Sequence, residues 1–244
     1  MKNKSSEGNP IILTLIGYYL PGFKSGGPLR SVENLVAALG EEFYFKILTT
    51  DRDLGDDVPY PGVPVHRWIK AGNVDVLYLR PGLRGFLKMV SLLTLVDRKT
   101  VLYLNSFFAR RFSMLAMLLR RIGLCRPGRV VLAPRGEFSP GALTLKGSRK
   151  TRFITISRWL GIYKNIVWHA STDLEGADIR NWFPRLQSFD PQSISVNGGD
   201  AANTGGVLAT ARDLPSAKLR AERVTRHKTA GKLRVVFVSR ISRK

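Results

Sequence analysis

The sequence predicts an α/β fold built on a doubly wound, mostly parallel Rossmann-like sheet with helices on both faces. Short apolar runs of strand length alternate with amphipathic runs of helix length through most of the 244 residues. This alternation favours parallel strands joined by helical crossovers, which cover both faces of the sheet. The chain is also long enough, and with 44% hydrophobic residues apolar enough, to bury a substantial core.

The predicted strands are short apolar runs bounded by turn residues. The first run is followed by a loop with a glycine pair, and the second by a loop rich in Asp, Pro and Gly. Seven such runs precede residue 200: Ile11–Gly17, Phe43–Thr50, Val74–Arg80, Thr100–Ser106, Arg129–Gly136, Asn165–Ser171 and Gln192–Gly199.

Amphipathic segments between these runs predict the helices. In Pro28–Gly40 the proline suits a first turn, apolar residues recur at helical spacing, and the glycine suits the end of the helix. In Thr172–Phe183, Thr172 and Glu175 have the spacing of a capping box. The other predicted helices are Gly85–Val96, Phe108–Leu124 and Ser148–Tyr163.

The composition of the chain changes after the seventh predicted strand. Residues 200–231 are small, polar and basic, without apolar periodicity, and this predicts a linker. Residues 1–199 would then form one domain. Leu233–Val238 again has the pattern of a buried strand, so residues 232–244 are expected to begin a second α/β domain.

The positive charge is concentrated in the middle of the chain. The net charge is +21, and Phe108–Lys164 has 13 Lys and Arg and one acid, Glu137, for a net charge of +12. Such a segment attracts nucleic acid, anionic lipid headgroups or phosphorylated substrates. The alternative is a solvated face with Arg and Lys stems lying over helices. The candidate basic patch is Lys146, Arg149, Lys150 and Arg152.

The cellular setting is predicted from what the sequence contains. The apolar runs are shorter than a transmembrane helix, and the single cysteine, Cys125, suits a reducing compartment. These features predict a cytoplasmic protein, which the basic patch could hold at the inner face of a membrane.

Candidate site residues follow the predicted strands, because ligands on such sheets bind at the carboxyl ends of the strands. Gly26 and Gly27 precede a helix and could let backbone N–H groups approach an anion, although a flexible turn explains them equally well. Arg135 could share that anion. Glu137 is a candidate general base or hydroxyl-binding carboxylate, or it could pair with Arg135. His169 is interpreted as a hydrogen-bonded core histidine, and no cluster has metal-ligand spacing, so no metal is expected.

Several of these stretches together carry a family resemblance. The segments are YYLPGFKSGGPLRSVENLVAALG, TTDRDLGDDVPY, LAPRGEFSPGALTLK, WHASTDLEGADIRNWFP and SISVNGGD. In this order they resemble the amino-terminal, acceptor-side half of a retaining, family-4-type glycosyltransferase with two Rossmann-like domains, the GT-B fold. The resemblance covers essentially the whole chain.

The resemblance implies a nucleotide-sugar donor, a glycan or lipid-linked acceptor, and a role in cell-surface polysaccharide or glycolipid biosynthesis, without a cofactor or metal. In the family a strand ending in Ser-Arg opens the donor domain, so Arg240 would contact the donor diphosphate and Lys244 would match only weakly. The donor domain itself would be missing, so the 244-residue chain is expected to be an inactive fragment. The alternative is a noncatalytic basic module that binds anionic membrane or nucleic acid. Nucleic acid is the less favoured partner, because the sequence has no recognition motif for it.

Overall fold

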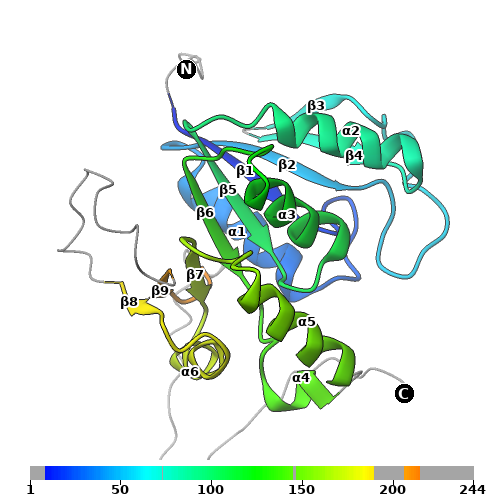
Figure 1. Cartoon of the computed structure of the whole chain (residues 1–244). Helices are drawn as coiled ribbons and strands as arrows, with labels where there is room; N and C mark the ends of the chain where they lie inside the picture. Colours follow the sequence, from blue (N-terminus) through cyan, green and yellow to red (C-terminus); the bar gives the residue numbers. More distant parts are fainter. Residues whose placement is uncertain (1–8, 73, 145–146, 190–205, 215–244) are drawn as a thin grey trace, which may run out of the picture. The chain divides into compact units, whose positions relative to one another are not determined.

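The computed structural model describes residues 9–72, 74–144, 147–189 and 206–214, all of which belong to one compact unit (Figure 1). Nine strands form one sheet in the order β3-β4-β2-β1-β5-β6-β7-β9-β8. All neighbouring strands are parallel except β3 and β4. The strands are β1 (Ile11–Leu15), β2 (Tyr44–Thr50), β3 (Trp68–Ala71), β4 (Val74–Leu79), β5 (Thr100–Asn105), β6 (Arg129–Ala133), β7 (Val167–Ala170), β8 (Gln187–Ser188) and β9 (Val207–Thr210).

Helices cover both faces of the sheet, which confirms the predicted fold class. In Figure 1 helix α1 lies behind the strands, and α2 and α3 lie in front of them. The helical elements are α1 (Gly27–Leu39), α2 (Leu83–Thr94), the π-helical turn η1 (Arg110–Met114), α3 (Leu115–Arg121), α4 (Pro140–Thr144), α5 (Gly147–Trp159) and α6 (Asp173–Trp182).

Two apolar clusters form the core, one on each face. Leu29 and Val32 of α1 pack with one set of strand residues, including Ile12 and Phe45. The other cluster combines the opposite strand faces with α2, α3, α5 and α6, and Trp168 is completely buried in it. Strands covered on both sides lack polar alternation, which is why the central strands were recognisable as apolar runs.

The chain order of the central strands creates a switch point. Strand β1 lies between β2 and β5, with Ile11 opposite both Tyr44 and Thr100. The chain therefore leaves β1 toward one side of the sheet and later returns at β5 on the other side. Loops diverge at the carboxyl ends of these two strands, which is where ligands bind in sheets of this kind.

The predicted linker is wrong at residues 207–210. These residues form β9, which pairs in parallel with β7 from Val167↔Val207 to Ala170↔Thr210. Leu208 is buried against the helices, so the three apolar residues Val207, Leu208 and Ala209 in a polar stretch are sufficient for a strand once a sheet edge is available. The predicted strands Gln192–Gly199 and Leu233–Val238 lie outside the described residues.

Other differences concern short elements. Strands β3 and β8 were not predicted, since two to four residues show no period. The predicted helix Phe108–Leu124 is divided into η1 and α3. The predicted helix Ser148–Tyr163 ends earlier, at Trp159, and α4 precedes it.

Candidate functional site

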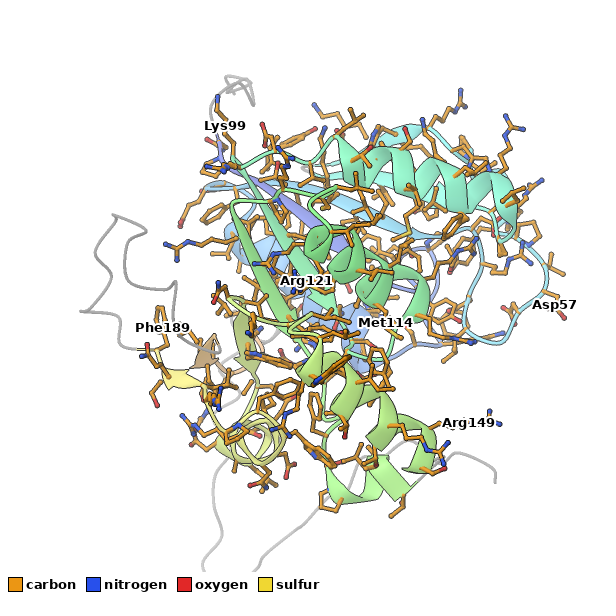
Figure 2. All side chains as sticks on the ribbon, viewed as in Figure 1. Asp57, Lys99, Met114, Arg121, Arg149 and Phe189 are labelled. Atoms are coloured by element: carbon orange, nitrogen blue, oxygen red, sulfur yellow. The ribbon has the colours of Figure 1, made fainter. Side chains whose placement is uncertain are left out.

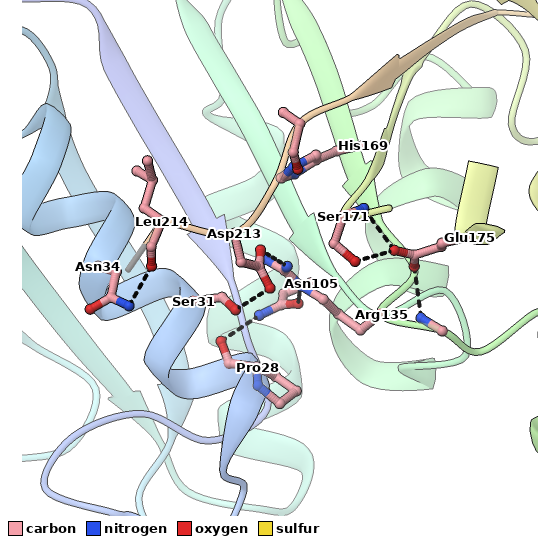
Figure 3. Close-up of polar contacts among 12 residues, drawn as sticks. Pro28, Ser31, Asn34, Asn105, Arg135, His169, Ser171, Glu175, Asp213 and Leu214 are labelled. Carbon is pink, nitrogen blue, oxygen red and sulfur yellow. Dashed lines mark hydrogen bonds and ion pairs between the residues drawn. The ribbon is translucent and has the colours of Figure 1, made fainter. Parts of the chain in front are cut away.

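The candidate site lies at the carboxyl edge of the sheet, where loops after β1, β5, β6, β7 and β9 meet. Figure 3 shows the polar contacts that join Asn105, Asp213 and Leu214 to α1, and those of Glu175 between the loops after β6 and β7. The parallel strands β1, β5, β6 and β7 all end at this edge. Side chains from distant parts of the sequence are therefore brought together.

The loop between β1 and α1 is held by an acid that the sequence did not single out. Buried Asp53 accepts hydrogen bonds from the backbone N–H groups of Phe23 (2.7 Å) and Lys24 (3.0 Å), and from that of Leu54 (2.8 Å). Burial by itself raises the pKa of Asp53, but these N–H donors and the Lys24 charge outweigh it and hold the pKa below its ordinary value. Asp53 thus fixes the approach to the glycine pair.

The glycine pair stands at the amino end of α1. Gly26 is the N-cap residue with φ +64°, and Gly27 is the first residue of the helix. This helix end has no side-chain cap and no acid in its first turn. A Cβ atom added at either glycine would meet no atom within 4 Å, so the positive end of the helix dipole borders open space.

Arg135 lies beside this helix end, with its side chain 10% exposed. Its Nε donates to Asn105 Oδ1 (2.9 Å), and Asn105 Nδ2 in turn donates to the carbonyl oxygen of Pro28 in α1 (3.1 Å). Arg135 Nη2 donates to Tyr103 Oη (3.0 Å). The structure thus places Arg135 and the amino end of α1 at the same edge of the sheet, joined through Asn105, and the anion-binding role of Arg135 and the glycine pair stays a prediction.

A carboxylate occupies the space between Arg135 and α1. Asp213, which follows β9, pairs with Arg135 Nη1 and accepts a hydrogen bond from Ser31 Oγ (2.8 Å). Burial alone would raise the pKa of Asp213. The Arg135 charge and the hydrogen bonds from Arg135 and Ser31 outweigh this effect and hold the pKa below its ordinary value. The hypothesis that Arg135 pairs with Glu137 is wrong, since its ion-pair partner is Asp213.

Glu137 contacts the loop after β5 rather than Arg135. One carboxylate oxygen accepts a hydrogen bond from Ser106 Oγ (2.6 Å), and the other accepts from the backbone N–H groups of Phe107 and Phe108. Burial raises the pKa of Glu137, an effect that these hydrogen bonds partly offset. The contacts describe a residue that positions a loop, and its tentative catalytic role stays a prediction.

Glu175 fastens the neighbouring loops. Thr172 Oγ1 accepts from the Glu175 backbone N–H (3.1 Å), as the capping box predicts. The Glu175 carboxylate, however, accepts from the backbone N–H groups of Ser171 (2.8 Å) and Gly136 (2.7 Å). The buried carboxylate therefore satisfies a donor in the β6 loop in addition to its own helix end.

His169 is hydrogen-bonded at both ring nitrogens. Nδ1 lies 3.1 Å from Tyr103 Oη, and Nε2 lies 2.9 Å from the carbonyl oxygen of Ala211. His169 therefore ties the segment after β9 to β5, in keeping with the structural role that the sequence suggested. Among the described residues no three His, Cys, Asp or Glu side chains are grouped so that they could hold a metal ion.

The predicted basic patch is only partly an outward-facing surface. Arg149 and Arg152 are exposed on α5, and Figure 2 shows Arg149 pointing away from the helix. Lys150 Nζ instead donates to the carbonyl oxygen of Ala142 (2.5 Å) and lies 5.3 Å from the centre of the Phe108 ring. Lys146, Arg240 and Lys244 lie outside the described residues. No helix in the described part of the chain is both long and apolar enough to cross a membrane.

The comparisons with known proteins found similar solved structures only. No family model matches the chain, and no curated protein matches it in sequence. Among the similar structures are an α,α-trehalose 6-phosphate synthase from Burkholderia multivorans (14% identity, TM-score 0.43, 82% of this chain and 47% of that one) and a UDP-forming α,α-trehalose-phosphate synthase from Burkholderia xenovorans (15%, 0.43, 82% and 47%). A third is the UDP-forming enzyme from Burkholderia vietnamiensis (12%, 0.41, 72% and 43%). The chain spans less than half the length of each of these proteins.

Proposed function

We propose that residues 9–214 form the acceptor-side domain of a retaining, nucleotide-sugar-dependent glycosyltransferase of the family-4 type. The observation that carries the proposal is the amino end of α1. There Gly26 leaves the helix without a side-chain cap beside open space, and Arg135 and Ser31 bind the two oxygens of the Asp213 carboxylate, which a substrate anion would displace. Helix dipole, guanidinium and hydroxyl together suit a negatively charged oxygen of a substrate.

The proposed acceptor is a glycan or lipid-linked glycan of cell-surface polysaccharide or glycolipid biosynthesis. The buried carboxylates would act indirectly, since Asp53, Glu137 and Glu175 each hold a loop that borders the site. The donor diphosphate would bind to a second domain that begins near residue 232, with Arg240 as its first contact. Neither a metal nor a cofactor is part of this proposal, and the protein would work at the cytoplasmic side of a membrane.

Transfer of this kind requires donor and acceptor in one cleft between two domains, because positioning supplies much of the rate. A single diphosphate contact outside a sheltered cleft is screened by salt and gives little affinity. The 244-residue chain is therefore expected to bind nucleotide sugars no more tightly than roughly millimolar, and to transfer none.

Isothermal titration with UDP-, GDP- and ADP-sugars tests this proposal. The 244-residue chain should show no micromolar binding, whereas a chain extended by a second domain of the family type should bind one donor and transfer its sugar. Replacement of Arg240 by alanine in the extended chain should weaken donor binding. Micromolar binding to the 244-residue chain, or no binding by the extended chain, would contradict the proposal.

A second candidate is a noncatalytic basic module, which the +12 charge of Phe108–Lys164 favours. Its partner would be an anionic membrane or a nucleic acid. Nucleic-acid binding would weaken steeply with salt and would not depend on lipid, whereas membrane binding would require anionic vesicles.

A further inference from the structure

The helices α2, α3 and α5 on one face of the sheet, together with η1, contain no acidic residue. Their sequences include ten Lys and Arg residues, namely Arg84, Lys88, Arg110, Arg111, Arg120, Arg121, Arg149, Lys150, Arg152 and Arg158. By contrast, α1 on the other face contains Glu33, and α6, which packs on the same face as these helices, contains Asp173, Glu175 and Asp178. Soluble surfaces usually mix both signs of charge, so this helical layer is set apart from the rest of the described surface.

The same layer exposes large apolar side chains near the carboxyl ends of two helices. Leu118 and Ile122, four residues apart at the end of α3, are exposed, Ile122 to 60%. Ile156 in α5 and Leu160 just after it are also four residues apart and exposed, and Trp159 between them is 83% exposed. Residues four apart lie on one side of a helix, so each pair forms an outward apolar stripe.

Two arginines bring these stripes together. Arg121 Nε donates to the carbonyl oxygen of Leu160 (3.0 Å). Arg120 donates through both terminal nitrogens to the carbonyl oxygens of Lys164 and Asn165 (3.1 Å each). The end of α3 is therefore fastened to the turn that follows α5. We name the combined patch the α3–α5 surface; it consists of Leu118, Arg121, Ile122, Ile156, Arg158, Trp159, Leu160 and Lys164.

A hollow of about 560 Å³ adjoins this surface. Its lining includes the aromatic residues Trp159, Tyr163 and Phe183 and the cationic residues Arg158, Lys164 and Arg185. No acid lines it. The combination of aromatic and cationic lining residues suits an amphiphile with a negatively charged head.

We propose that the α3–α5 surface docks on an anionic phospholipid bilayer. Trp159 and the aliphatic side chains would enter the headgroup region, where aromatic and branched residues are stable, while the arginine and lysine heads contact lipid phosphates. Exposed aliphatic residues gain nothing from nucleic acid, and a protein partner with both signs of charge would leave like charges facing each other. The unbroken positive sign and the exposed apolar stripes together fit a bilayer.

The docking proposal assigns a membrane-binding surface that the proposed function does not include. It rests on the proposed function in one respect, namely that the acceptor is located at a membrane. The α3–α5 surface differs from the basic patch that the sequence suggested. That patch lies at the beginning of α5, around Lys150, whereas the α3–α5 surface lies around the end of α5, near the amino end of β7. The candidate site lies at the opposite, carboxyl edge of the sheet, so docking through the α3–α5 surface would leave it uncovered.

Vesicle flotation of the 244-residue chain tests the docking. The chain should float with vesicles of phosphatidylcholine and phosphatidylglycerol, but not with pure phosphatidylcholine, and salt should weaken the binding. Arg158→Glu with Lys164→Glu should lower the vesicle partition coefficient at least roughly tenfold, since each basic residue contributes separately. Trp159→Ser should also lower it, and should abolish any blue shift of tryptophan fluorescence on binding.

Matched controls lie outside the surface. Val58→Ser, at a side chain 75% exposed in the loop after β2, removes an apolar group, and Arg67→Glu reverses an exposed charge before β3. Neither should change flotation. Equal flotation of surface and control variants would overturn the proposal, as would equal binding to neutral vesicles or binding to RNA with no binding to vesicles. Because flotation requires no sugar substrate, its outcome is separate from that of the transfer experiment.

Discussion

Gly26 and Gly27 differ in backbone conformation although both border open space. Only Gly26 has a positive φ, at +64° with ψ −121°, a region that residues with a Cβ atom rarely adopt. Gly26→Ala should therefore lower the free energy of unfolding by about 1–2 kcal/mol or more. Gly27→Ala adds the same methyl group without this strain and should be neutral or slightly stabilising.

Urea denaturation of both variants checks this prediction. Equal stability of the two variants would mean that the strained conformation at Gly26 is not required. The matched pair separates backbone strain from crowding, since neither new methyl group would meet a neighbour.

Asp53 should make stability depend on pH. Its pKa is lowered in the folded state, so above the ordinary value of 3.8 the carboxylate stabilises the fold fully. As the pH falls below that value, the unfolded chain takes up the proton first and the contribution is lost. Asp53→Asn should cost about 1–3 kcal/mol at neutral pH, because three N–H donors lose a charged acceptor.

The measurement is the free energy of unfolding of the native chain and of Asp53→Asn between neutral and acidic pH. The difference between the two should shrink as the pH falls. A difference that stayed constant would show that the Asp53 charge does not hold the β1–α1 loop.

At the scale of elements, the sequence predicted most of the central sheet. Strands such as Thr100–Asn105 were recognisable because burial on both faces leaves an unbroken apolar run. The glycine pair and Arg135 were found because the carboxyl edge of a parallel sheet is a general binding place. Asp53 and Asp213 were not found, since their partners, apart from Leu54 beside Asp53, lie 29 or more residues away in the sequence and no local pattern records such contacts.

Strand β9 shows the same limit. Four residues have no measurable period, and their flanks are polar. Leu208→Ala should lower the free energy of unfolding by about 2–4 kcal/mol, because Leu208 is buried at 2% exposure in the core cluster of the helical face. Thr210→Ala, in the same strand but exposed, should change it by less than about 0.5 kcal/mol. Thermal unfolding compares the two, and equal effects would argue that residues 207–210 behave as a linker.

For the whole molecule, the charge imbalance should appear in the salt dependence of stability. The described residues of the segment from 108 to 164 include Glu137 as their single acid, and its carboxylate is directed at neighbouring backbone. Repulsion among the cations acts over about 30 Å at 0.01 M salt but only about 8 Å at 0.15 M. Raising the salt concentration across this range should increase the free energy of unfolding by on the order of 1 kcal/mol.

Urea denaturation at the two salt concentrations measures this effect. Sodium chloride and potassium chloride should act alike, because screening depends on ionic strength and not on the cation. A stability independent of salt would indicate that the positive charges are too well solvated to repel one another.

The carboxylate of Asp213 has a consequence for any ligand at the α1 end. Arg135 and Ser31 already bind it, so a phosphate or sulfate ion must compete with a group that is part of the same chain. The measured dissociation constant of such an anion equals the intrinsic one divided by the fraction of molecules in which Asp213 has moved away. Weak anion binding by this protein would therefore reflect an internal competitor and not a poor site, and Asp213→Asn should bind the same anion more tightly.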